Sequence, residues 1–168
     1  MLIVEDGTGK SDSDSYISLV DAMALAEKYG YTLPADDTAA EVALRQGAGY
    51  VDMQESCFGG ARKLPTQALA WPRIGAKTTF KADIADDAIP SQLFMAQVAA
   101  AAEYGAGVDV RATDDGKAIA SEEVTGAVAV SYFNNGKTGN TVVITKAMDA
   151  LKTLMTSCSN GFEFRVYR

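Results

Sequence analysis

Residues 67–73 read Gln67-Ala68-Leu69-Ala70-Trp71-Pro72-Arg73 and include the only tryptophan of the 168-residue chain. Pro72 has no backbone N–H and disfavours a helical conformation at the residue before it, so we expect no helix to run through Trp71. A large aromatic side chain beside such a turn usually packs on neighbouring helices, with its indole N–H bonded locally. The alternative is a ring that binds a ligand. We therefore predict that Trp71, Pro72 and Arg73 form a structural anchor between two helix-rich regions.

The first helix-rich region follows residues 1–17, which we expect to form a short edge strand at 1–4 and then a loop rich in Gly, Ser and Asp. Ser18 stands three residues before Asp21, at the start of a segment with helical periodicity, in a pattern similar to a capping box. Gly30 follows that segment, as glycine commonly follows a helix. The first helix should therefore lie between Ser18 and Gly30.

A second helix is predicted over residues 39–54, where Thr38 and Glu41 repeat the capping pattern. Its interior contains Gly47 and Gly49, each of which costs about 1 kcal/mol relative to alanine in a helix. Close approach of another helix is one explanation for these two glycines.

The second helix-rich region begins at Pro90, which suits the first position of a helix because its missing N–H is not needed there. The helix should continue to about Tyr104, and it is apolar nearly all round. Such a helix normally lies at the centre of a domain or between subunits. Residues 56–88, between the two regions, lack periodicity and are expected to form a non-helical connection.

Farther along the chain the hydrophobic period changes to two. Segments 119–124 and 128–133 are predicted to form a hairpin within a β region at 118–145. Helical spacing returns at 146–156. Residues 162–168 alternate again and predict a terminal strand.

Length and pattern together predict one domain over residues 1–168. Its class is expected to be α+β and mainly α: a four-helix-type bundle with a small antiparallel hairpin or sheet and a C-terminal strand. The bundle should occupy residues 18–105, interrupted by the non-helical connection at 56–88.

The net charge of −7 opposes non-specific binding to nucleic acid or to an anionic membrane. We expect no membrane partner, because no apolar run reaches the length that spans a bilayer, and no signal peptide, because the N-terminus lacks a basic region and a long apolar run. The chain contains no histidine, which removes the usual general base and the commonest metal ligand. We therefore predict no enzymatic activity, no cofactor and no metal.

The two cysteines, Cys57 and Cys158, are far apart in sequence and lack the spacing of a metal site. This pattern predicts two free thiols in a reduced, cytosolic setting.

Residues 62–81, here called the basic segment, carry five positive side chains and no acidic one: Arg62, Lys63, Arg73, Lys77 and Lys81. One interpretation is a solvated loop whose charges are balanced by Asp83, Asp86 and Asp87 just downstream. The other is a contact surface for a polyanion or an acidic partner.

Four short stretches, in this order and spacing, resemble one known family. They are Leu2-Ile3-Val4-Glu5-Asp6-Gly7-Thr8-Gly9, Asp14-Ser15-Tyr16-Ile17-Ser18, residues 67–73, and Ile89-Pro90 at the start of an alanine-rich helix. The family comprises small tailed-phage proteins described either as DnaT-like single-stranded-DNA-binding proteins or as head-tail connector (adaptor) proteins. The resemblance covers about residues 1–133, and Asp14 replaces the usual asparagine before the Ser-Tyr pair.

The resemblance implies a structural virion protein without catalytic activity. Its subunits form a ring, commonly of twelve copies in that family, between the portal protein and the tail or its stopper or nozzle protein. DNA would pass through the lumen without being gripped, and the ring would form in the host cytoplasm and remain in the neck of the virion. The terminal strand fits addition to a sheet edge of a neighbouring subunit or of the portal. Its candidate contact residues are Phe162, Phe164, Arg165, Val166, Tyr167 and Arg168.

Two alternatives stay open. The terminal strand could instead pair with residues 128–133 of its own domain. The chain could also bind single-stranded DNA through the basic segment, with Trp71 as a stacking platform.

Overall fold

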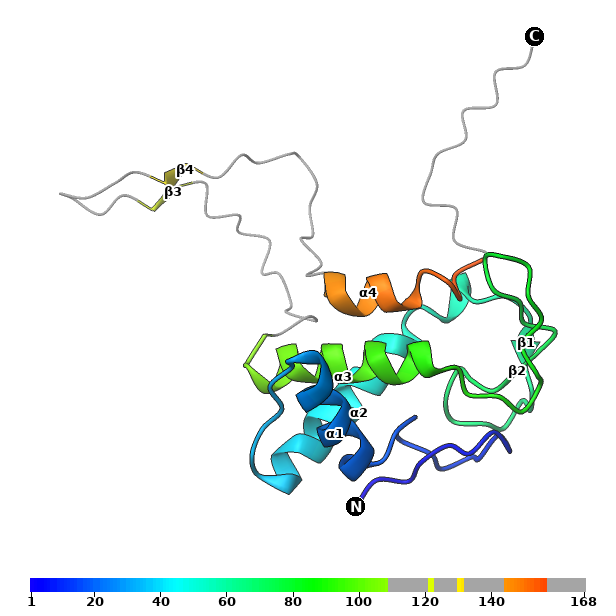
Figure 1. Ribbon diagram of the computed structural model, residues 1–168, viewed down its shortest axis with the longest axis horizontal. Helices are drawn as coiled ribbons and strands as arrows, with labels where there is room; N and C mark the ends of the chain where they lie inside the picture. The colour runs from blue at the N-terminus through cyan, green and yellow to red at the C-terminus, as the bar shows by residue number, and fades with distance from the viewer. Residues whose placement is uncertain (109–120, 123–129, 132–143, 157–168) are drawn as a thin grey trace, which may run out of the picture. The chain divides into compact units, whose positions relative to one another are not determined.

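The computed structural model describes residues 1–108, 121–122, 130–131 and 144–156, which are coloured along the chain in Figure 1. The chain divides into two compact units, residues 1–108 with 144–168, and residues 109–143. The elements in chain order are α1 (Leu19–Tyr29), α2 (Asp37–Asp52), the 3-10 turn η1 (Glu55–Cys57), β1 (Ala61–Arg62), β2 (Arg73–Ile74), α3 (Ser91–Gly105), β3 (Ser121–Glu122), β4 (Val130–Ser131) and α4 (Thr145–Leu151). The predicted class, α+β with helices dominant, is confirmed, although a four-helix bundle is not established.

The ends of α1 follow the predicted signals. The Ser18 hydroxyl accepts a hydrogen bond from the backbone N–H of Asp21 at 3.1 Å, and Gly30 closes the helix in a left-handed conformation with φ of 71°. The start of α2 differs from the prediction. Asp36 caps it by accepting from the N–H of Ala39 at 2.9 Å, so the helix begins ahead of Thr38. A carboxylate was available two residues earlier and suits the positive end of the helix dipole.

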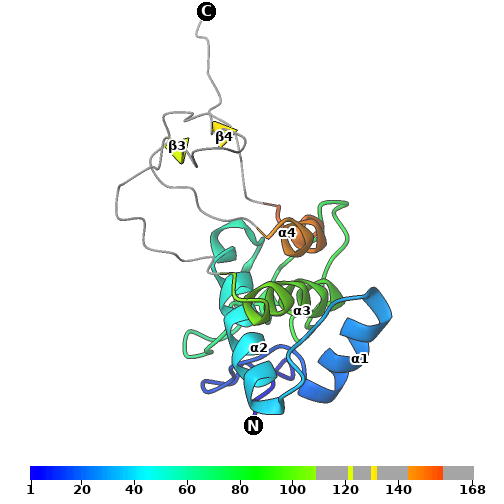
Figure 2. The same cartoon turned by 90° about the vertical axis from the view of Figure 1, so that its left-hand side faces the viewer.

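Helix α3 is central, as its apolar character predicted, and it contacts each of the other three helices. Figure 2 shows α3 flanked by α1, α2 and α4. Pro90 is the N-cap of α3 instead of its first residue, so the helix begins at Ser91, one residue later than predicted. Gly47 of α2 lies where the two helices meet, because a Cβ there would stand 2.4 Å from the carbonyl oxygen of Gln97. Close helix approach therefore accounts for Gly47, whereas a Cβ at Gly49 would meet nothing within 4 Å.

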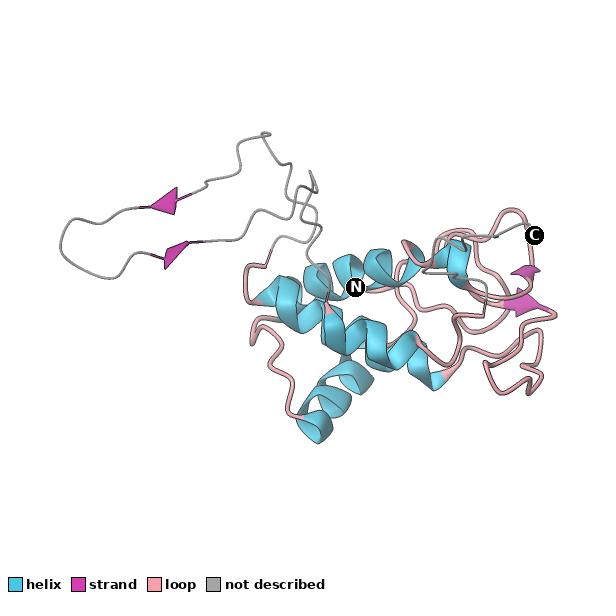
Figure 3. Cartoon of the chain, turned by 90° about the horizontal axis from the view of Figure 1, so that it is seen from above, coloured by secondary structure: helices cyan, strands magenta, loops and turns pink. Residues whose placement is uncertain are grey.

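The connection between α2 and α3 contains one 3-10 turn and one short antiparallel pair. Strands β1 and β2 pair with Ala61 opposite Ile74 and Arg62 opposite Arg73; Figure 3 shows them beyond the ends of the helices. An isolated antiparallel bridge joins Phe58 to Met155. The connection is thus tied to the segment that follows α4.

Three predicted segments at the chain's ends differ or lie outside the described residues. Residues 1–4 form no strand, only a parallel bridge between Val4 and Ser15. Helix α4 ends at Leu151 instead of residue 156, because the chain leaves it in a turn where the N–H of Leu154 bonds the Leu151 carbonyl at 2.8 Å. The predicted strand at 162–168 lies outside the described residues.

The second unit contains the predicted hairpin pairing. Strands β3 and β4 are antiparallel, with Ser121 opposite Ser131 and Glu122 opposite Val130. The remainder of the two predicted strands lies outside the described part of the chain.

Cys57 is disulfide-bonded, so the prediction of two free thiols is wrong. Distance along the sequence carries little information about distance in the fold. Cys158 lies outside the described residues. Among the residues that the structure describes, no helix is long and apolar enough to cross a bilayer.

Candidate nucleic-acid interface

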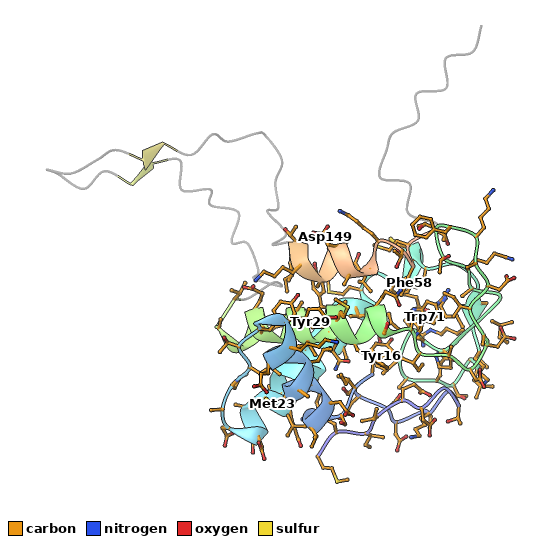
Figure 4. The ribbon with its side chains drawn as sticks, in the orientation of Figure 1. Tyr16, Met23, Tyr29, Phe58, Trp71 and Asp149 are labelled. Atoms are coloured by element: carbon orange, nitrogen blue, oxygen red, sulfur yellow. The ribbon has the colours of Figure 1, made fainter. Side chains whose placement is uncertain are left out.

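Trp71 is buried in the first unit and only 1 % exposed. Its ring meets that of Phe58 edge to face, with 5.8 Å between the ring centroids; Figure 4 labels both residues. The indole Nε1 has no hydrogen-bond partner in the described part of the chain, so the predicted local acceptor is not present there. A ring this deeply buried is closed to a nucleobase, and Trp71 is not a stacking platform in this structure.

The hydroxyl group of Tyr16 connects the Trp71 stretch to α2. It donates to Asp52 Oδ1 and accepts from the backbone N–H of Trp71 at 3.3 Å. Asp52 also accepts from the N–H of Ala70 at 3.2 Å. Burial raises the pKa of the Asp52 carboxyl to about 6, although the hydrogen bonds from Tyr16 and Ala70 act to lower it. Burial, together with the charge of Asp52, also holds the pKa of Tyr16 well above its ordinary value.

Gln97 connects the same region to α3. This side chain is fully buried: its Oε1 accepts from the N–H of Tyr16 at 3.0 Å, and its Nε2 donates to Ser15 Oγ at 2.7 Å and to the Leu44 carbonyl at 2.9 Å. The polar atoms of Gln97 are thus satisfied by two separate segments, residues 15–16 and α2, which makes it a structural residue.

The N-terminal glycine-rich loop folds around its own carboxylate. Glu5 is 3 % exposed and accepts hydrogen bonds from the backbone N–H groups of Gly7, Gly9 and Lys10 at 2.8–2.9 Å and from Ser13 Oγ at 3.1 Å. Successive backbone N–H groups commonly form an anion-binding concavity. Here an internal anion fills it, so this loop is not open to a phosphate.

Residues 67–73 dock on that loop. The Gln67 side chain donates to the carbonyls of Leu69 and Pro72, and the N–H of Ala68 bonds the Lys10 carbonyl at 2.9 Å. The ammonium group of Lys63 donates to the Gly7 carbonyl at 2.9 Å. The contacts around residues 67–73 therefore hold the loop against the rest of the first unit.

The two arginines of the basic segment are engaged inside the fold. Arg73 is 5 % exposed and donates to the carbonyls of Gly59, Gly60 and Ala70 at 2.8–3.2 Å. Arg62 forms a bidentate pair with Glu55, both distances being 2.6 Å. These hydrogen bonds hold the pKa of Glu55 below its usual value. The arginines predicted to belong to a contact surface thus serve mainly to hold the connection together.

The lysines of the basic segment differ from its arginines. Lys77 and Lys81 are exposed and Lys63 is half-buried. Lys77 forms an ion pair with Asp83 in which both side chains are largely exposed. No carboxylate in the described residues lies within ion-pairing distance of Lys81. The structure therefore presents Lys77 and Lys81 to solvent, whereas Lys63 and the two arginines are engaged within the fold.

Residues 77–83 form a tight turn that carries an exposed aromatic ring. The N–H of Thr78 bonds the Ala82 carbonyl at 2.9 Å, and the N–H of Lys81 bonds the Thr78 carbonyl at 2.8 Å. Phe80 stands between the two exposed lysines and is 82 % exposed. Sequence reasoning missed Phe80, and the only local signal was a phenylalanine in a polar stretch between Lys77 and Lys81.

A family model described as "Putative DnaT-like ssDNA binding protein" matches residues 1–168. The chain belongs to this family. No curated protein and no solved structure gives a significant match. Membership of the DnaT-like family confirms one of the two descriptions in the resemblance and extends it over the whole chain. The head-tail connector description stays a prediction.

In this DnaT-like family member, several residues of the stretches that resemble the family are buried and have structural roles. Glu5, Tyr16, Trp71 and Arg73 all take part in the buried contacts described above. The predicted terminal contact residues, at 162–168, lie outside the described residues. The exposed side chains of Lys77, Phe80 and Lys81, which follow the Trp71 stretch in sequence, form the candidate interface.

Proposed function

We propose that the chain binds single-stranded DNA through the exposed lysines of the basic segment. The observation that carries this proposal is the match of the DnaT-like family over all 168 residues. Lys77 and Lys81 are the exposed cations that supply the local attraction for phosphates. The function is binding, without catalysis or a cofactor.

The charge distribution limits the strength of this binding. The net charge is −7, and Asp83, Asp86 and Asp87 follow the lysines directly, so attraction is confined to a small area. The Lys77–Asp83 pair is largely exposed and contributes little energy, so a phosphate can compete for the lysine. We expect affinity that is weak at physiological salt and falls steeply as salt increases.

The proposed binding mode differs from the one suggested by the sequence, in which all the cations of the basic segment and the Trp71 ring would contact DNA. Trp71 and Arg73 are buried, and Arg62 is paired with Glu55. Substituting these residues would damage the fold and would give a misleading loss of binding. The informative substitutions are at the lysines.

The proposal is tested by fluorescence anisotropy with a labelled single-stranded oligonucleotide and its duplex, at low salt. We expect the single strand to bind more tightly than the duplex, and Lys77→Gln with Lys81→Gln to weaken single-strand binding. Lys28→Gln is the matched control, because Lys28 is an exposed lysine near the end of α1, remote in sequence from the basic segment. Equal weakening by Lys28→Gln, or no binding by the unmodified chain at low salt, would contradict the proposal.

A second candidate is the head-tail connector. The resemblance of the four quoted stretches supports it, and so do exposed apolar side chains on two helices: Val20 of α1 is 78 % exposed and Val42 of α2 is 48 % exposed. Contact between subunits would cover such groups. In this proposal the chain is a structural component of the virion neck, and its partners are copies of itself, the portal and the tail or stopper protein.

Light scattering and negative-stain imaging separate the two candidates. A connector is expected to form rings, alone or on a portal ring, and to ignore single-stranded DNA at low salt. A chain that stays monomeric with portal present and shifts in mass on adding single-stranded DNA would exclude the connector and support the first proposal.

A further inference from the structure

We propose that Phe80 is a base-stacking residue: its ring packs on a nucleobase of single-stranded DNA while Lys77 and Lys81 contact the neighbouring phosphates. This inference rests on the proposed single-strand binding and assigns it a particular residue.

The exposure of Phe80 is the first observation. Its side chain is 82 % exposed, although burying a phenylalanine side chain is worth about 1.5–3 kcal/mol. Every other aromatic side chain that the structure describes is more buried than this one. In the free chain, the free energy that burial of this ring would contribute is therefore still available for binding a partner.

The turn presents the ring in a defined place. The hydrogen bonds within 77–83 close the turn, and the Thr78 hydroxyl accepts from the N–H of Ala82 at 3.1 Å. The N–H of Thr79 bonds the Thr153 carbonyl at 2.8 Å, which fixes the turn to the segment after α4. The ring therefore projects from an anchored turn, so less conformational entropy is lost when it makes a contact.

The charges beside the ring favour a nucleic acid over an apolar protein surface. Lys81 has φ of 64°, a left-handed conformation that glycine adopts more readily. Lys81 directly follows Phe80 in the chain and is exposed. Covering the ring with an apolar partner would bury the ammonium group of Lys81 without an ion-pair partner, which is unfavourable. A single strand instead offers a base to the ring and phosphates to Lys77 and Lys81, the combination used by single-strand-binding surfaces.

The decisive variants are Phe80→Ala and Phe80→Trp, with Val20→Ala as the control for loss of another exposed apolar side chain. We expect Phe80→Ala to weaken single-strand affinity by about 5- to 150-fold, the range for losing one stacked base, and Val20→Ala to leave it unchanged. Thermal unfolding of each variant checks the fold, which a change at so exposed a side chain should not disturb.

Phe80→Trp adds a direct readout. We expect it to retain affinity, and its added emission to be quenched by the oligonucleotide, whereas the buried Trp71 of the unmodified chain should show little quenching. If the unmodified chain binds single strands and Phe80→Ala binds them equally well, the stacking assignment is wrong and the proposed function stands. If Phe80→Ala changes the oligomeric mass and leaves DNA affinity intact, the ring contacts protein and the assignment is again wrong. Failure of the unmodified chain to bind would overturn both.

Discussion

The hydroxyl group of Tyr16 donates a hydrogen bond to the carboxylate of Asp52 and accepts one from the backbone N–H of Trp71. This one group joins the N-terminal segment, helix α2 and the non-helical connection. The basic segment lies within that connection, so the Tyr16–Asp52 contact helps to hold in place the part of the chain that carries the exposed lysines.

Tyr16→Phe should lower the free energy of unfolding by about 1–3 kcal/mol, because Asp52 loses a donor and the N–H of Trp71 loses its acceptor in a buried site. Chemical denaturation monitored by circular dichroism measures the change. Tyr29→Phe removes a hydroxyl from a side chain that is 46 % exposed and is expected to have little effect. Equal stability of Tyr16→Phe and the unmodified chain would refute the structural role.

The stability of the chain should carry a pH dependence from Asp52. Its pKa in the folded chain is about 6, against an ordinary value of 3.8. Between these two pH values the carboxyl is therefore protonated in the folded state and ionised in the unfolded state. The favourable contribution is complete below about pH 4 and is lost as the pH rises through about 6, by at most about 3 kcal/mol. The free energy of unfolding of the unmodified chain minus that of Asp52→Asn should therefore fall from pH 4 to pH 7. A difference that is flat across this range would contradict the shifted pKa.

The two glycines of α2 should respond oppositely to alanine. Gly47→Ala places a Cβ against the Gln97 carbonyl, 2.4 Å away, and should destabilise the chain by about 1–3 kcal/mol, as overpacking does. Gly49→Ala meets nothing within 4 Å and should stabilise it by up to about 1 kcal/mol, from helix propensity. Thermal and chemical unfolding of the two variants form an internal control, and similar effects of both would rule out the close contact between α2 and α3.

Within the basic segment, arginine and lysine substitutions should separate stability from binding. Arg73→Lys loses the planar fork that serves the carbonyls of Gly59, Gly60 and Ala70, and we expect a loss of about 2–4 kcal/mol in unfolding free energy. Lys81→Gln, at an exposed position, should change that free energy by less than about 0.5 kcal/mol. Denaturant titrations of both variants make the comparison, and a Lys81→Gln variant that unfolds as readily as Arg73→Lys would show that this lysine is structural too.

Local signals predicted those parts of the fold that local chemistry decides. The boundaries of α1 follow from Ser18 and Gly30, and the central place of α3 follows from its apolar surface. The start of α2 was misplaced because Asp36 and Thr38 are both plausible caps, and backbone geometry selected the first. The disulfide bond of Cys57 was not predicted, because it depends on which residues lie close together in the fold, and the position of Cys57 in the sequence does not indicate this.

The candidate interface was predictable only in part. The basic segment was visible as a run of cations, but the run does not reveal which of them are paired. Glu55, which forms an ion pair with Arg62, precedes the basic segment. The hydrogen-bond acceptors of the buried Arg73 side chain include backbone carbonyls, which cannot be identified by counting charged residues. The exposure of Phe80 likewise depends on how the turn at 77–83 is anchored to Thr153.

The most direct test of the account is the salt dependence of single-stranded-DNA affinity for the unmodified chain and for Lys81→Gln. With contacts from Lys77 and Lys81, the logarithm of the affinity should fall against the logarithm of salt concentration with a slope of about −1.4, and Lys81→Gln should make the slope shallower by about 0.7. Absence of binding at low salt, or a slope that the Lys81→Gln substitution leaves unchanged, would contradict the proposed interface.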